Sequence, residues 1–219
     1  MKKIFLLVAF VVIGSSSLLA QERDQDRIQD QDRTKLIMID GEMLEVRERA
    51  QIRLQDELTL NDGTVISPNG RFQTANRENM RLRNDECLDS DGIKYRNEYQ
   101  YRYKVQQDNK GLTQAQIQER NQNRVHYVLV EGEVMQVRTQ SQNRLQQQIN
   151  LENGTLVNPD GTYQAKDRKQ IRLKDGECLT MDGQMFKNSF EHRKMIQNKI
   201  MKKKNILNKP SFKKKRSKV

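Results

Sequence analysis

Residues 36–44 read LIMIDGEML, and residues 127–135 read YVLVEGEVM. The second stretch follows the first by 91 positions, and the same offset aligns residues 36–92 with residues 127–183 without a gap. The alignment contains 22 identities in 57 positions. They include Gly41/Gly132, Gly63/Gly154, Pro68/Pro159, Gly70/Gly161, Cys87/Cys178 and Gly92/Gly183. Similarity that keeps register over this length indicates an internal duplication, so we expect two copies of one structural unit.

Turn dipeptides divide each copy into short apolar segments. They are Asp40-Gly41, Asp62-Gly63, Asn69-Gly70 and Asp91-Gly92 in the first copy, and Asn153-Gly154, Asp160-Gly161, Asp175-Gly176 and Asp182-Gly183 in the second. Such pairs readily adopt the positive φ angles of tight hairpin turns. Strand-sized segments between them predict six to eight short strands per copy. We therefore predict a mainly β protein with two tandem small β-meander domains, which pack together because each alone buries little surface.

The N-terminus has the three parts of a secretory signal. Lys2-Lys3 is followed by an apolar run over residues 4–13 and by Ala20 before the first polar residue. This pattern predicts export and cleavage after Ala20, to the periplasm, the cell envelope or the medium. The apolar run is too short to span a bilayer, so we expect no transmembrane span in the mature chain.

The predicted organisation follows from these features. We expect a signal peptide at 1–20, a polar disordered lead-in at 21–35, a first β domain at 36–96, a Tyr-rich and then Gln/Asn-rich linker at 97–126, a second β domain at 127–187, and a basic tail at 188–219 that is helical and then disordered. Within the linker, Thr113 and Gln116 have the spacing of a capping box and predict a short helix.

The net charge of +11 is unevenly distributed. Residues 21–186 carry −3, whereas residues 187–219 carry +12, with 13 Lys+Arg and one acidic residue. A nucleic-acid-binding body needs a basic face, so we regard nucleic acid as an unlikely partner. A basic helix and a basic end are typical of segments that contact an anionic membrane or an envelope polymer, although a solvated tail has the same composition. The predicted contact residues are Lys202, Lys203, Lys204, Lys213, Lys214, Lys215 and Arg216.

Cys87 and Cys178 occupy equivalent positions in the two copies. In an oxidising compartment they are a candidate disulfide, because a bridge across a pseudo-two-fold axis joins equivalent residues. The alternative is that both are packed free thiols. In a recurring Gly-Glu motif, Met43 and Val134 occupy the position that the two cysteines occupy in its other occurrences. On this interpretation the position simply favours a mid-sized apolar side chain.

Tyrosines recur at alternate positions near the end of the first copy. Tyr95, Tyr99, Tyr101 and Tyr103 alternate with charged and polar residues, which predicts a strand with one aromatic face. Three of them, at positions 95, 99 and 103, also align on one side of a helix. An aromatic face binds sugars by stacking, whereas the plainer interpretation is that the tyrosines cover the rim of the first domain.

Motifs of catalysis are missing from the sequence. It has two histidines, His126 and His192, and no phosphate-binding loop, Gly-x-Ser-x-Gly, Cys-x-x-Cys or His-Glu-x-x-His. Residues 89–92 and 158–161 resemble parts of a calcium loop but lack the remaining ligands, so turn formation explains them. We expect a non-enzymatic protein without a catalytic site, a cofactor or a resident metal.

The repeated turns resemble an exported bacterial family of domains of unknown function, whose members have short strands, Asp-Gly turns and often many methionines. The resemblance rests on residues 40–44, 61–64 and 68–70, and on the closing segment at 173–183 of the second copy. This chain departs from the family in its few methionines, with three in the first copy and two in the second. The resemblance implies two β-rich copies and no established activity.

The sequence therefore favours an exported structural or binding protein whose basic tail contacts an anionic surface. A soft-metal-binding or metal-stress protein that uses Met and Cys side chains is the main alternative. A carbohydrate-binding module that uses the Tyr95–Tyr103 face is a second alternative.

Overall fold

The computed structural model describes residues 34–122, 124–164 and 169–207. The first copy contains β1 (Thr34–Ile39), β2 (Glu42–Arg53), β3 (Leu58–Thr59), β4 (Val65–Ile66), β5 (Arg71–Gln73), β6 (Asn79–Arg81), β7 (Cys87–Asp89) and β8 (Lys94–Tyr95). The second contains β9 (Val125–Val130), β10 (Glu133–Arg144), β11 (Ile149–Asn150), β12 (Leu156–Val157), β13 (Thr162–Gln164), β14 (Gln170–Arg172), β15 (Cys178–Thr180) and β16 (Met185–Phe186). Helices α2 (Glu98–Asp108) and α3 (Gln114–Gln122) join the copies, and α4 (Ser189–Leu207) follows the second.

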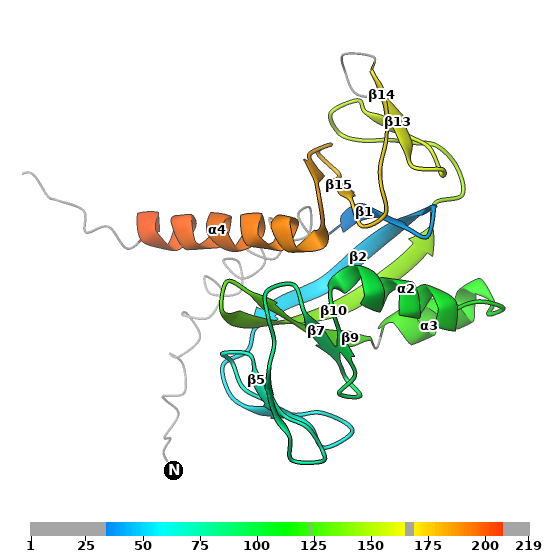
Figure 1. The fold of residues 1–219 in the computed structure, drawn as a ribbon. Coiled ribbons are helices and arrows are strands. Elements are labelled where there is room, and N and C mark those ends of the chain that lie inside the picture. The colour runs from blue at the N-terminus through cyan, green and yellow to red at the C-terminus, as the bar shows by residue number, and fades with distance from the viewer. Residues whose placement is uncertain (1–33, 123, 165–168, 208–219) are drawn as a thin grey trace, which may run out of the picture.

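The two copies share one antiparallel sheet of eight strands, in the order β16-β15-β1-β2-β10-β9-β7-β8 (Figure 1). The long strands β2 and β10 pair at its centre. The outer strands are exchanged between copies, because β7 of the first copy pairs with β9 and β15 of the second pairs with β1. Each copy also forms a separate four-stranded sheet, β3–β6 in the first and β11–β14 in the second.

Two-residue turns fix the hairpins at the centre of the large sheet. Asp40 and Gly41 have φ angles of 52° and 73°, and Glu131 and Gly132 have 49° and 84°. Positive φ at both central residues is the geometry of a type I′ turn, whose twist matches that of paired strands. The aligned sequence letters DG and EG therefore produce the same hairpin in both copies.

Each core combines side chains from both copies. One cluster joins β1 and β2 to the small sheet of the second copy through Leu36, Met38, Met43, Leu145, Leu151, Val157, Tyr163, Leu173 and Leu179. Its counterpart joins the small sheet of the first copy to β9 and β10 through Leu60, Ile66, Phe72, Leu82, Leu88, Tyr127, Leu129 and Val134. The exchange of strands therefore extends to the packing, and each small sheet is buried against the other copy's hairpin.

The helices cover the opposite face of the large sheet. Along β1, Leu36 and Met38 face the small sheet, whereas Ile37 and Ile39 belong to a second cluster with Tyr99 of α2 and Met195 of α4. This alternation explains why β1 is buried on both faces. The result is three layers, with the small sheets on one side of the central sheet and α2 and α4 on the other.

The mainly β class, the two copies and the C-terminal helix predicted from the sequence are confirmed, and each copy contributes eight strands. The capping box is also confirmed, because the Thr113 backbone N–H donates to Gln116 Oε1 and the Gln116 N–H donates back to Thr113 Oγ1. A strand over the tyrosine segment is wrong, since residues 98–108 form α2. The predicted signal peptide and the tail from residue 208 lie outside the described residues.

Candidate functional site

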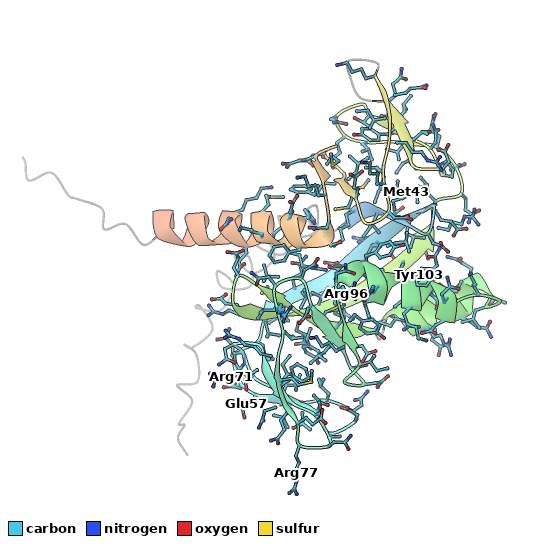
Figure 2. The ribbon with its side chains drawn as sticks, in the orientation of Figure 1. Met43, Glu57, Arg71, Arg77, Arg96 and Tyr103 are labelled. Atoms are coloured by element: carbon cyan, nitrogen blue, oxygen red, sulfur yellow. The ribbon has the colours of Figure 1, made fainter. Side chains whose placement is uncertain are left out.

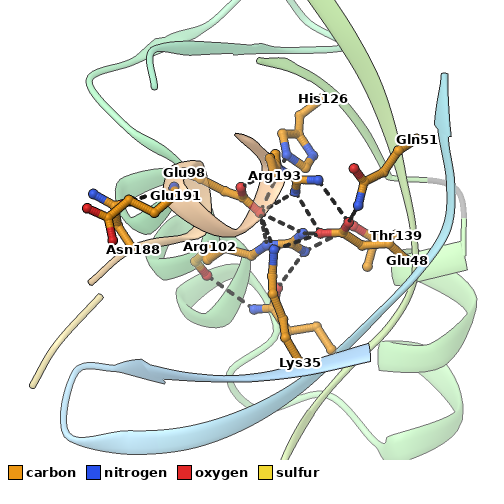
Figure 3. Close-up of polar contacts among 11 residues, drawn as sticks. Lys35, Glu48, Gln51, Glu98, Arg102, His126, Thr139, Asn188, Glu191 and Arg193 are labelled. Carbon is orange, nitrogen blue, oxygen red and sulfur yellow. Dashed lines mark hydrogen bonds and ion pairs between the residues drawn. The ribbon is translucent and has the colours of Figure 1, made fainter. Parts of the chain in front are cut away.

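A cluster of buried charged side chains lies where α2, α4 and the central strands meet (Figure 3). Its members come from distant parts of the chain and are all at most 2% exposed. They are Lys35 of β1, Glu48 of β2, Glu98 and Arg102 of α2, His126 of β9 and Arg193 of α4. Charged side chains are rarely buried to this degree unless they are paired.

The two arginines hold the same two carboxylates. Arg193 donates to Glu98 through Nε (2.9 Å) and Nη2 (2.7 Å), and to Glu48 through Nη1 (2.9 Å) and Nη2 (2.7 Å). Arg102 donates through Nη2 to Glu48 (3.0 Å) and to Glu98 (3.1 Å), and through Nη1 to Thr139 Oγ1 (3.0 Å). These contacts fasten both helices to the centre of the sheet.

The two glutamates of the cluster are ionised at neutral pH, and its histidine is uncharged. Burial alone raises the pKa of Glu48, but Arg193 and Lys35 beside it hold that pKa well below its usual range, and Glu98 is held down in the same way. Burial lowers the pKa of His126 to about 3, so it is uncharged at neutral pH. Two carboxylates then face three cations, and the cluster carries a formal charge of +1.

Lys35 is the least well satisfied member of the cluster. Its Nζ lies 3.2 Å from Glu48 and 3.6 Å from Glu98, but it forms no hydrogen bond with acceptable geometry to any described residue. Among the described residues, the ring nitrogens of His126 also have no hydrogen-bond partner, and Nε2 lies 3.7 Å from Glu98 Oε1. The two arginines therefore donate most of the hydrogen bonds that the two carboxylates accept.

The two arginines of the cluster occupy equivalent positions in the two copies. The offset of 91 continues beyond the aligned core and makes Arg102 equivalent to Arg193 and Asn97 equivalent to Asn188. Asn97 Oδ1 accepts from the N–H of Gln100, and Asn188 Oδ1 accepts from the N–H of Glu191, so the same residue type begins both helices. The sequence predictions missed this cluster. Extending the repeat alignment past residue 92 reveals that the two arginines are equivalent, but not that they are buried or which carboxylates they bind.

Helix α4 is fixed to the body at its beginning. His192, Arg193 and Ile196 are at most 8% exposed, and Arg193 makes the four hydrogen bonds described above. The helix then continues to Leu207 and runs out beyond the central sheet (Figure 1). Lys202, Lys203 and Lys204 of the predicted contact set lie on this second half, whereas Lys213, Lys214, Lys215 and Arg216 lie outside the described residues.

The candidate disulfide between Cys87 and Cys178 is not formed, because both cysteines are free and buried. They lie on β7 and β15, which are separated by the four strands β1, β2, β10 and β9. Five strand spacings amount to about 24 Å, far beyond the reach of a disulfide. Burial raises the pKa of the Cys178 thiol to about 11 and that of Cys87 well above its usual value. The alternative interpretation, two packed thiols, fits the structure.

The four tyrosines do not form one aromatic face, and this prediction is also wrong. Tyr101 is 3% exposed and packs in the core, with its ring 4.4 Å from that of His126. Tyr95 is partly buried and donates to Asp89 Oδ2, while Tyr99 packs beside the core cluster of β1. Tyr103 is the exposed member, at 38%. Tyr95 lies on β8, and α2 turns the other three side chains in different directions, so no stacking platform results.

The soft-metal donors are brought together only in part, since Met38 and Met43 are register partners in one buried cluster with Met181 packed against it. Met38 and Met43 are buried in the core, and the two thiols are far apart in the sheet. Within the described residues no three His, Cys, Asp or Glu side chains gather in a way that suits a metal ion.

A cavity of about 330 Å³ opens between α2, α3 and the ends of β2 and β10. Among its described lining residues, amides predominate: Gln106, Asn109, Gln114, Gln142, Asn143 and Gln146. Its one acidic residue, Glu42, is paired with Arg144 at 2.9 Å. This lining therefore offers mainly amide hydrogen-bond donors and acceptors.

In the described part of the chain, no helix has the length and apolar character that crossing a bilayer requires. No curated protein and no solved structure matches the chain. A family model of a domain of unknown function, DUF6799, matches residues 33–93 and again residues 124–185. These two matches cover more than half of the sequence and coincide with the two copies, so the chain belongs to the family of the domain of unknown function DUF6799 and carries two copies of that domain.

Proposed function

We propose that this is an exported, non-enzymatic protein that uses its folded body to present a basic helix to an anionic polymer of the cell envelope. The observation that carries the proposal is the anchoring of α4. Its first turns are locked to Glu48 and Glu98 by Arg193, and its second half runs out beyond the sheet (Figure 1). Residues 200–219 contain nine Lys+Arg and no acidic residue.

The distribution of lysines on α4 favours a hydrated polymer over a bilayer. Lys202, Lys203 and Lys204 are consecutive, and successive residues on a helix are 100° apart. Three consecutive lysines therefore span about 200° of the circumference. The nearby apolar positions Ile200, Ile206 and Leu207 fall within this same arc of the helical wheel, so they form no stripe opposite the charges. A helix that lies in a membrane interface needs such a stripe opposite its charges. A polyanion needs only positive charge along the helix, and it releases counterions when it binds.

The experiment compares two triple variants of the full chain. The tail variant is Lys202→Gln/Lys203→Gln/Lys204→Gln, and the matched control is Arg47→Gln/Arg96→Gln/Lys110→Gln, which removes three exposed charges from the body. Binding to a soluble polyglutamate and to phosphatidylglycerol vesicles is measured over a range of salt concentrations.

We expect the tail variant to weaken polyglutamate binding at least tenfold and to reduce the slope of log K against log salt by about two. The control is expected to change affinity less than threefold. Equal losses in both variants would contradict the proposal, because they would indicate a response to net charge alone. Tight binding to vesicles with none to polyglutamate would contradict the choice of a polymer.

A further inference from the structure

The outward face of the β5–β6 hairpin carries an arrangement of arginines that the tail does not explain. In the register of these strands, Arg71 lies directly opposite Arg81, Phe72 opposite Met80 and Gln73 opposite Asn79. Phe72 is 4% exposed and faces the core, so the pairs on either side of it face solvent. Both Arg71 and Arg81 are exposed.

A third arginine extends the same row. Leu82 is buried at 1%, whereas Arg81 at the end of β6 and Arg83 just after it are both exposed. Side chains directly opposite on neighbouring strands lie about 5 Å apart at Cβ, and residues two apart along a strand lie about 7 Å apart. Arg71, Arg81 and Arg83 therefore place three guanidinium groups on one small patch, which we call the arginine patch.

Two acidic side chains near the arginine patch have partners other than its arginines. Glu57, which lies on the same side of the small sheet as Arg71 in Figure 2, accepts a hydrogen bond of 2.7 Å from Ser67 Oγ. Glu86 pairs with Lys94 at 2.8 Å and accepts from the backbone N–H of Arg83. Among the described residues no carboxylate forms an ion pair with Arg71 or Arg81.

Unpaired like charges directly across a strand pair are destabilising, and a bridging anion removes that repulsion. Guanidinium groups bind phosphate, sulfate and carboxylate through paired hydrogen bonds. The second copy keeps part of this row, with Arg172 and Lys174 at the positions of Arg81 and Arg83, but Thr162 replaces Arg71. The first copy is therefore the better anion site.

We propose that the arginine patch is a second anion-binding site, built into the fold and independent of the tail, for an extended polyanion whose charged groups are spaced about 5–7 Å apart. The proposal goes beyond the role of the tail, because the patch lies on the small sheet of the first copy. One polyanion chain that contacts both regions binds more tightly than it does to either alone.

The test uses the full chain and two double variants with equal charge change. Arg71→Gln/Arg81→Gln removes the patch, and Arg47→Gln/Arg96→Gln is the control, because these two exposed arginines are not register partners. The probes are single-stranded oligothymidylate, which carries phosphodiesters, and polyglutamate, which carries carboxylates. Affinities are measured at fixed salt, and amide shifts of residues 71–83 are followed by NMR in the Lys202→Gln/Lys203→Gln/Lys204→Gln background.

We expect the patch variant to weaken binding at least fivefold and the control less than twofold, with amide shifts at residues 71–83 that persist when the tail lysines are replaced. Stronger binding of one probe identifies the preferred anion. Equal losses in both double variants, or no shifts at residues 71–83, would overturn the proposal. If the patch variant binds normally while the tail variant does not, the patch proposal fails and the tail function stands. If the tail variant binds normally while the patch variant does not, the tail function fails and the patch proposal stands.

Discussion

Replacing Arg193 by Met tests whether the buried cluster holds α4 to the body. The substitution keeps an apolar stem of similar length and removes four hydrogen bonds of 2.7–2.9 Å to Glu48 and Glu98. Both carboxylates stay buried, with fewer donors. Removal of one partner from a buried ion pair costs about 3–5 kcal/mol, because the remaining charge keeps its desolvation penalty. We expect Arg193→Met to lower the free energy of unfolding by that amount.

Lys35→Met is the matched comparison within the same cluster. Lys35 makes no well-formed hydrogen bond, and its removal changes the formal charge of the cluster from +1 to 0. Replacing it by an apolar side chain is therefore expected to change stability by less than about 1 kcal/mol, or to increase it. The two substitutions remove the same charge, so a difference between them reports hydrogen bonding and not charge.

Urea denaturation followed by circular dichroism measures both effects, with the m value as the check that unfolding remains comparable. A loss of 3–5 kcal/mol corresponds to a fall in Tm on the order of 10 °C for a chain of this size. The reasoning is refuted if Arg193→Met costs less than about 1 kcal/mol, or if Lys35→Met costs as much as Arg193→Met.

Three further predictions concern pH, packing and thiols. Burial lowers the pKa of both His126 and His192 to about 3, below the ordinary 6.5, so the unfolded chain binds protons that the folded chain does not. Stability should therefore fall as pH drops from about 6.5 toward 3, by up to about 2.7 kcal/mol per unit, and His126→Gln/His192→Tyr should flatten this slope in urea titrations. Gly161 has a φ of 81°, and a Cβ there would lie 2.7 Å from a buried methionine, so Gly161→Ala should lower the free energy of unfolding, measured by urea denaturation, by more than about 1 kcal/mol; an unchanged free energy of unfolding would show that the neighbour yields freely. A thiol reagent should find Cys87 and Cys178 unreactive in the native protein and should titrate two thiols in urea; one disulfide and no thiols would contradict the structure.

The helical state of residues 98–108 shows where pattern reading failed. Its inward face consists of Glu98, Tyr101, Arg102 and Val105, which have the spacing of a helix. Two of the four are charged, so an apolar pattern does not reveal the face. Tyrosines at alternate positions instead produced a period of two. The cap at Asn97 was the local signal for a helix start.

The sequence by itself determined the duplication, the hairpin turns, the capping box at Thr113 and the location of the positive charge, because these depend on local conformation and composition. It did not determine which copy each outer strand joins. Strands β7 and β15 are three residues long and almost wholly buried, so their sequences fit any partner strand that offers an apolar face. The tertiary packing decides that β7 pairs with β9 and β15 with β1. It also did not reveal the buried cluster, since charged residues are ordinarily solvated. Glu48, Arg102 and Arg193 become partners only when the tertiary fold brings two helices and the central strands to one point and removes water from it.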